Sequence, residues 1–298
     1  MSQHQLYGGV EAGGTKFICV VGSGPENILE QTRIDTTVPE ETLCIVIRFF
    51  QPYTTTGKIA AIGIGCFGPL DLNPDSPTYG FITSTPKPRW SNTDVLGTIR
   101  RALKINVAFD MDVNTAALGE FRWGASQGTD PSLYITIGTG IGGGYIKDGK
   151  ALIGMNNLEM GHIRLPHDLK RDPFPGACPF HGDCFEGLAS GPAIEKRFNA
   201  RGETIHDDDP FWDIEADYIA LALSNTILTL SPKRIILGGG IMQRTFLLPL
   251  IRRKVMETLN GYVESESLLK NIDQYIVPPK LGNRSGSLGA IALAQSFA

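Results

Sequence analysis

Four side chains of the kind that bind transition metals lie within 23 residues of this sequence: His162, Cys178, His181 and Cys184. Two thiolates and two imidazoles suit tetrahedral zinc, and a site closed by four protein ligands is structural. The last three ligands have the tight spacing Cys-x2-His-x2-Cys, whereas the first step matches no standard zinc finger. The alternative is that the four residues are unrelated. We predict a structural zinc site in a loop spanning about residues 156–187.

Two carboxylates, Glu159 and Glu186, bracket these ligands, so zinc would order a loop that carries them. Three further histidines, His4, His167 and His206, have no such neighbours, and we expect them to be solvated. His167 is the only one of the three close enough to serve as an alternate ligand.

Two glycine-rich turns favour phosphate binding. Gly13-Gly14-Thr15-Lys16 combines backbone N–H groups with a hydroxyl and an ammonium, and Gly138-Thr139-Gly140 repeats the turn with a hydroxyl. Concave arrays of backbone N–H groups bind polyphosphate, with lysine as a point charge. Neither turn has the Walker A spacing. One such turn is weak evidence, but two similar turns favour a nucleotide site.

Asp112 follows a short predicted strand, 107–109, and precedes a predicted helix, 115–123. A general base that takes a proton from an attacking hydroxyl suits this position. The alternative is helix capping, in which Asp and Asn are favoured, and we expect Asn114 to cap the helix.

The elements around these residues alternate between strands and helices. Strands are predicted at 58–67 and 234–237, and helices at 93–104, 215–230 and 247–262. Each glycine-rich turn joins two apolar strands, near residues 5 and 132, which indicates two related halves. The sequence predicts an α/β fold with a parallel or mixed sheet.

Composition restricts the function. The 298 residues carry a net charge of −4 with no basic block, so we expect no nucleic-acid or anionic-membrane partner. No signal peptide or transmembrane stretch is visible, and Cys19, Cys44 and Cys66 resemble buried thiols. We therefore expect a cytoplasmic protein.

Several motifs together resemble the ROK family of sugar kinases and sugar-responsive repressors. They are Gly-Val-Glu-Ala-Gly-Gly-Thr-Lys (9–16), Ile-Gly-Ile-Gly-Cys-Phe-Gly-Pro (62–69), Asp-Val-Asn-Thr-Ala-Ala-Leu-Gly-Glu (112–120), Ile-Gly-Thr-Gly-Ile-Gly-Gly-Gly (137–144) and Leu-Gly-Gly-Gly-Ile (237–241). The similarity spans roughly residues 6–295. It is strongest to the bacterial zinc-containing fructokinase branch, through Ser-Thr-Pro-Lys (84–87), the 178–192 segment and Tyr-Ile-Val-Pro-Pro (275–279).

This resemblance implies two actin-like domains of the hexokinase type around a central cleft. The small domain would comprise residues 1–115 and 287–298, and the large domain 116–286. The family assigns the catalytic base to Asp112 and the ATP phosphates to Gly13, Gly14, Thr15, Lys16, Thr139 and Gly140. It assigns adenosine to Gly239 and Gly240, and the sugar to Glu159, His162 and Glu186. Magnesium would arrive with ATP.

Two residues depart from the family pattern. Glu11 stands where aspartate is usual, so its contact to the magnesium shell would be indirect. Met111 stands where glucose-specific members carry asparagine, and a thioether is a poor hydrogen-bond partner for a sugar.

The resulting hypothesis is an ATP-dependent kinase acting on the 6-hydroxyl of D-fructose. Alternatives are a broader or different hexose kinase, for mannose, glucose or an N-acetylhexosamine, and a sugar-sensing regulator. Because the first hairpin begins by Tyr7 and the net charge is negative, we expect no DNA-binding domain. We expect the apolar helix 247–259 to be exposed, which favours a homodimer. Contact of Lys87 or Arg89 with substrate stays open, and a solvated loop charge is the alternative.

Overall fold

The computed structural model describes residues 5–297, which divide into two compact units. Unit 1 comprises Met1–Gln127 with Leu281–Ala298, and unit 2 comprises Gly128–Lys280. The domain boundaries predicted at 115/116 and 286/287 stay predictions, whereas the contacts divide the chain at 127/128 and 280/281.

Unit 1 is built on a five-stranded sheet with the order β3-β2-β1-β4-β7. Strands β1 and β2 form an antiparallel hairpin, and β1, β4 and β7 run parallel. Its elements are β1 (Leu6–Ala12), β2 (Lys16–Gly24), β3 (Asn27–Asp35), α1 (Pro39–Thr55), β4 (Ile59–Cys66), β5 (Phe81–Ile82), β6 (Thr93–Asp94), α2 (Val95–Leu103), β7 (Asn106–Met111), α3 (Asp112–Trp123), η4 (Gly282–Arg284) and α10 (Ser285–Phe297).

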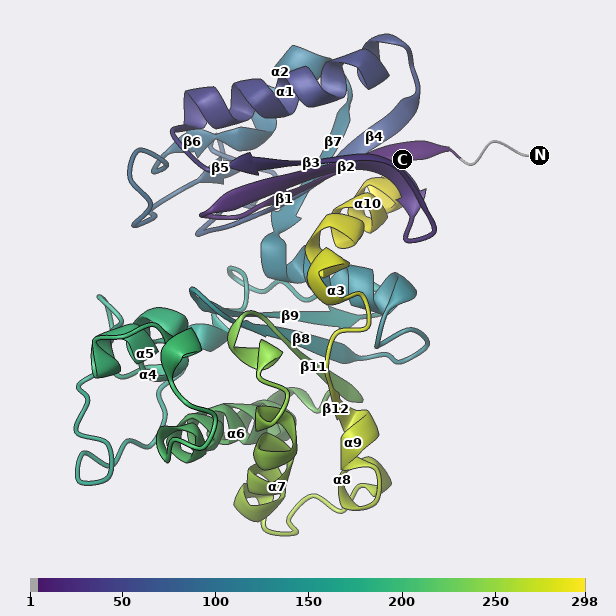
Figure 1. Ribbon diagram of the computed structural model, residues 1–298. Helices are drawn as coiled ribbons and strands as arrows, with labels where there is room; N and C mark the ends of the chain where they lie inside the picture. Colours follow the sequence, from purple (N-terminus) through teal and green to yellow (C-terminus); the bar gives the residue numbers. More distant parts are fainter. Residues whose placement is uncertain (1–4, 298) are drawn as a thin grey trace. The chain divides into compact units, whose positions relative to one another are not determined.

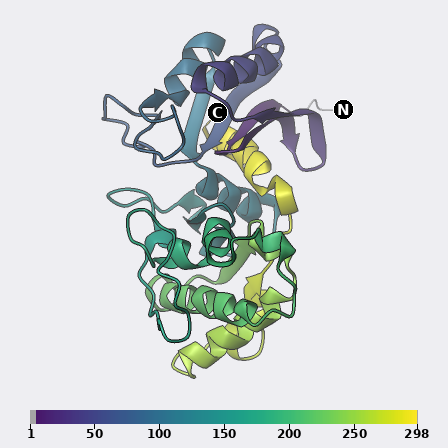
Figure 2. The same cartoon turned by 60° about the vertical axis from the view of Figure 1, so that its left-hand side comes forward.

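Helices cover both faces of this sheet. Helices α1 and α2 lie on one side of the strands and α10 on the other (Figure 1, Figure 2). Neighbouring glycines of β1 show the alternation of a strand, since Gly8 faces Phe50 of α1 and Gly9 faces Ile291 of α10. Both faces are therefore buried, which explains the nearly continuous apolar sequence of β4.

Unit 2 repeats this topology with a five-stranded sheet of order β10-β9-β8-β11-β12. Strands β8 and β9 form the antiparallel hairpin, and β8, β11 and β12 run parallel. Its elements are β8 (Ser132–Ile137), β9 (Ile141–Lys147), β10 (Lys150–Ala151), η1 (Met160–His162), α4 (Phe185–Ala189), α5 (Gly191–Phe198), η2 (Gly202–Thr204), α6 (Phe211–Leu230), β11 (Arg234–Gly238), η3 (Ile241–Gln243), α7 (Leu247–Leu259), α8 (Glu266–Leu269), α9 (Ile272–Tyr275) and β12 (Ile276–Val277).

The predicted internal repeat is confirmed by these two sheets. Each begins with a hairpin whose turn is glycine-rich, at residues 13–15 and 138–140, and the hairpins start at Leu6 and Ser132. In each unit the third parallel strand lies at the sheet edge beyond the second.

Two predictions about apolar residues are wrong. The apolar positions of α7, Leu247, Ile251, Val255 and Leu259, are buried against α6 and the sheet of unit 2, so they offer no exposed face for a second copy. Cys44 is exposed on α1, because it lies beside the helix face formed by Leu43 and Val46 rather than on it. Cys19 and Cys66 are buried, as predicted.

Among residues 5–297, no helix combines the length and the apolar character that crossing a membrane requires.

Candidate functional site

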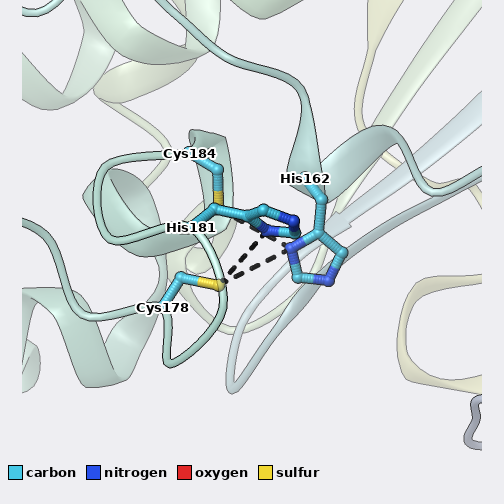
Figure 3. A group of neighbouring side chains, drawn as sticks. All are labelled: His162, Cys178, His181 and Cys184. Carbon is cyan, nitrogen blue, oxygen red and sulfur yellow. Dashed lines mark hydrogen bonds between the residues drawn. The ribbon is translucent and has the colours of Figure 1, made fainter.

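The four predicted metal ligands converge in unit 2. One ligand atom from each of His162, Cys178, His181 and Cys184 lies within 4.8 Å of the others. Cys178 and Cys184 approach histidine Nδ1 atoms at 3.6 Å, Cys178 that of His181 and Cys184 that of His162 (Figure 3). Sulfur and nitrogen bound to one tetrahedral zinc are about 3.6 Å apart, so the donor set and its spacing fit this metal.

Three segments bring the ligands together. His162 ends η1, His181 lies in the tight turn between Cys178 and Gly182, and Cys184 is the N-cap residue of α4. Burial first, and then the neighbouring Cys178 thiol and the charge of Glu186, raise the pKa of Cys184 to about 11. Metal binding must therefore displace a proton from this thiol.

His167 is buried rather than solvated, which corrects the prediction. Its side chain is 5% exposed, with Nε2 at 2.9 Å from the carbonyl oxygen of Asp172 and Nδ1 at 3.3 Å from a carboxylate oxygen of Asp183. It thus stabilises the loop next to the predicted metal ligands and is not one of the four clustered residues. His206 is exposed as predicted, and His4 lies outside the described residues.

Asp112 is the first residue of α3, directly after β7. Its Oδ1 accepts the backbone N–H of Val113 at 2.8 Å, and its carbonyl oxygen accepts the Thr115 hydroxyl at 2.7 Å. The positive end of the helix dipole favours the ionised carboxylate that a general base needs.

The helix starts earlier than predicted, and Asn114 does not cap it. Met111 is the N-cap residue, without a side-chain cap, and Asn114 is buried in the first turn. Its side-chain amide donates to Asp110 at 2.7 Å, and the same carboxylate oxygen accepts the Met111 N–H at 2.7 Å. Asp110 therefore holds the β7–α3 junction that carries Asp112, a role that the i, i+4 spacing of Asp110 and Asn114 could have suggested.

The β1–β2 turn and Asp112 lie at the same end of the sheet, beyond the carboxyl ends of the parallel strands β1 and β7. Ala12 is in register with Cys66, and Cys66 with Met111, so Gly13 and Asp112 follow strands that are two positions, about 10 Å, apart. The Gly13 N–H donates to the Lys16 carbonyl at 3.0 Å. Gly14 has open space where a side chain would be, and Thr15 and Lys16 are exposed.

The Glu11 side chain packs against the first turn of α10. Its carboxylate lies against Gly286 and accepts the backbone N–H of Ser287. Burial raises its pKa, and the Lys16 ammonium and the Ser287 amide only partly oppose this effect. The longer side chain is thus accommodated by a helix N-terminus, which favours its charge.

The predicted nucleotide residues of unit 2 lie together although a hundred positions separate them. A Cβ on Gly138 would lie 3.5 Å from the backbone nitrogen of Gly240. Gly239 has φ +95° and leaves no room for a Cβ beside the backbone of Ile137, so only glycine fits there. Thr139 and Gly240 are exposed.

The two bracketing carboxylates have different surroundings. Glu159 is exposed just before η1, and its carbonyl oxygen accepts the His162 N–H. Glu186 is half-buried in α4, and its Oε2 accepts the N–H of Ile141 at 2.9 Å, at the end of the 138–140 turn. The sequence leaves open whether Lys87 or Arg89 contacts substrate. In the structure, the Lys87 ammonium donates to the Thr36 carbonyl oxygen, and Arg89 forms an ion pair with Glu40.

Comparisons with known proteins agree with this arrangement. The fructokinase of Pediococcus pentosaceus is 45% identical over 291 residues, covering 98% of each chain, and that of Lactococcus lactis subsp. cremoris is 44% identical over 98% of this chain and 97% of its own. The ROK hexokinase structure from Thermus thermophilus superimposes with a TM-score of 0.79, at 25% identity over 98% of both chains. The predicted actin-like α/β fold class is confirmed. Because the ROK family model matches residues 7–296, the chain belongs to the ROK family.

Proposed function

We propose that this protein is an ATP-dependent fructokinase, which transfers the γ-phosphoryl group of ATP to the 6-hydroxyl of D-fructose. The observation that carries the proposal is the similarity, over 98% of the chain, to proteins named fructokinase. The local geometry of Asp112 and of the two glycine-rich turns supports the same reaction type.

Asp112 is the proposed general base. It would accept the proton of the fructose hydroxyl as the oxygen attacks phosphorus, and the positive end of the α3 dipole favours its ionised form. Its Oδ1 already accepts the Val113 N–H, which fixes the direction of the carboxylate. Asp110, by holding the preceding peptide, would limit the movement of this junction.

The phosphate groups are proposed to bind at both turns, through Gly13–Lys16 and through Thr139 and Gly140. Gly239 and Gly240 would contact adenosine, which fits their closeness to Gly138. Magnesium bound with ATP neutralises charge on the phosphates during transfer. Lys16 is exposed and would add a point charge there.

Fructose is proposed to bind through Glu159, His162 and Glu186. His162 directs Nδ1 toward the thiols, which leaves Nε2 on the opposite side of the ring for a sugar hydroxyl. Met111 packs its thioether against Gly68, about where glucose-specific members carry an amide. Without that amide, a site selective for the glucose hydroxyl pattern is disfavoured.

A structural zinc ion is the proposed occupant of the Cys/His cluster. His162, Cys178, His181 and Cys184 would hold it, and its binding energy would contribute to folding of the surrounding loop. Thiol ligands require reducing conditions, which supports the proposed cytoplasmic location. The apolar face of α7 is buried, so it does not support the proposed homodimer.

The test is an ADP-release assay with ATP and magnesium, run in parallel on fructose, mannose, glucose and N-acetylglucosamine. A kcat/KM at least about tenfold higher for fructose would support the proposal. Comparable values would indicate a broader hexose kinase, and no turnover with any of the four sugars would contradict the proposal.

A further inference from the structure

We propose that Glu186 is a positioning residue for the 138–140 turn, which is proposed to bind the ATP phosphates. Nucleotide binding by unit 2 then depends on the loop at about residues 156–187 that carries the four Cys and His residues, called here the metal loop. This inference rests on the proposed kinase function and deepens it. It concerns a carboxylate that the family resemblance assigns to the sugar.

The 138–140 turn is held by bonds from outside the hairpin. Glu186 Oε2 accepts the Ile141 N–H at 2.9 Å, and the Gly191 N–H donates to the Gly138 carbonyl at 2.8 Å. Inside the turn, the Gly138 N–H donates to the Gly140 carbonyl at 2.9 Å. A Cβ added to Gly140 would lie 2.9 Å from the same Glu186 oxygen, so the carboxylate fits closely against the turn.

The metal loop sets the position of Glu186. Cys184 is the N-cap residue of α4, and Glu186 lies in the first turn of that helix. The N–H of Phe185 donates to the carbonyl oxygen of Ile163 at 3.0 Å, which joins α4 to the residue after His162. On the other side, Gly161 leaves no room for a Cβ beside the carbonyl of Ile141. The N–H and the carbonyl group of Ile141 therefore each contact a segment that carries a predicted metal ligand.

Electrostatics alone would not place a carboxylate here. An anion beside a polyphosphate site is repulsive, so its presence needs a geometric reason. By accepting the Ile141 N–H, Glu186 fixes the backbone where the turn enters β9, and the second oxygen stays available for a sugar hydroxyl. One side chain can thus link sugar, metal loop and phosphate turn.

The experiment measures the dissociation constant of the magnesium complex of a non-hydrolysable ATP analogue by titration calorimetry, on zinc-loaded protein without sugar. Glu186→Ala should weaken binding about tenfold, because the turn loses a hydrogen bond to a charged acceptor. Glu186→Gln keeps a carbonyl acceptor and should restore affinity to within about threefold of wild type. Glu159→Ala, at an exposed position of the same loop, should leave analogue affinity unchanged and raise the KM for fructose.

Metal content is measured for every variant. Removal of zinc from the wild-type protein by chelation should lower its affinity for the magnesium–analogue complex by a similar factor. Wild-type affinity in Glu186→Ala would overturn the positioning role, as would a Glu186→Gln variant as weak as Glu186→Ala. Unchanged affinity after chelation would overturn the link to the metal loop. A wild-type protein that binds the analogue but phosphorylates no sugar would overturn the proposed function without touching this inference.

Discussion

At the scale of single residues, Asp112 has the position of a base at the start of a helix. Asp112→Asn keeps the size and the acceptor for the Val113 N–H but cannot take a proton. We expect kcat to fall by about 10²–10⁴-fold, with the affinity for an ATP analogue unchanged. Steady-state kinetics and calorimetry check this. The exposed Asp208→Asn is the matched control, and near-normal kcat in Asp112→Asn would remove the residue from the mechanism.

Glu215 is a fully buried carboxyl group that the proposed mechanism does not use. Both of its oxygens lack a hydrogen-bond partner among the described residues, and burial raises its pKa well above the ordinary range, with Arg197 opposing and Asp172 adding to the effect. The folded protein therefore holds a proton that the unfolded chain releases as the pH rises above the ordinary carboxyl value. Wild-type stability should decrease with pH in this window.

Glu215→Gln removes this titration while keeping the shape of the side chain. Up to the raised pKa of Glu215, the variant should gain stability relative to wild type by up to about 1.4 kcal/mol for each pH unit. Urea unfolding of both proteins between pH 5 and 8 measures the difference. Parallel curves would mean that Glu215 is ionised in the folded protein.

At the scale of elements, unit 1 depends on close packing between α3 and α10. Gly289 of α10 leaves no room for a Cβ beside the Thr115 carbonyl, and Gly119 of α3 faces Ser285 and Gly289 in return. Two helices approach this closely only where side chains are absent. The same contact joins the C-terminal helix to the helix that begins with Asp112.

Gly289→Ala should therefore destabilise the protein by about 1–3 kcal/mol, because the added methyl group forces α3 and α10 apart. The midpoint of thermal unfolding should fall, and kcat should fall with it if the shift reaches Asp112. Ser296→Ala, at an exposed position of the same helix, is the control and should have little effect. An unchanged midpoint in Gly289→Ala would contradict the close packing.

Sequence pattern predicted the existence of most elements at this scale. The predicted helix at 215–230 is the C-terminal part of α6, and the strand at 58–67 is β4. The predicted start of α3 is wrong because Asp112 and Asn114 are both common capping residues, and only their hydrogen-bond partners decide their roles. The i, i+4 spacing of Asp110 and Asn114 is compatible with their hydrogen bond, but spacing alone does not choose between that bond and helix capping.

At the scale of the whole molecule, the Cys/His cluster leads us to predict both the zinc content of the protein and its thermal stability. Wild-type protein should contain one zinc ion per chain, and Cys184→Ser should contain less and unfold at a lower temperature. Cys44→Ser, at the exposed cysteine outside the cluster, should match wild type in both respects. Atomic absorption and thermal unfolding provide the measurements, and full zinc content in Cys184→Ser would contradict the ligand assignment.

The sequence by itself determined the features that depend on neighbouring residues. These features are the glycine-rich turns, the ligand types at 162–184 and the repeated strand–turn–strand pattern. They follow from local geometry and donor chemistry, so the sequence alone predicts them. The tertiary structure alone decided which residues meet across long separations. It buried His167 and the apolar positions of α7, and it directed Glu186 to the Ile141 N–H. These outcomes depend on how distant segments pack, and that packing is a property of the whole fold rather than of any local pattern.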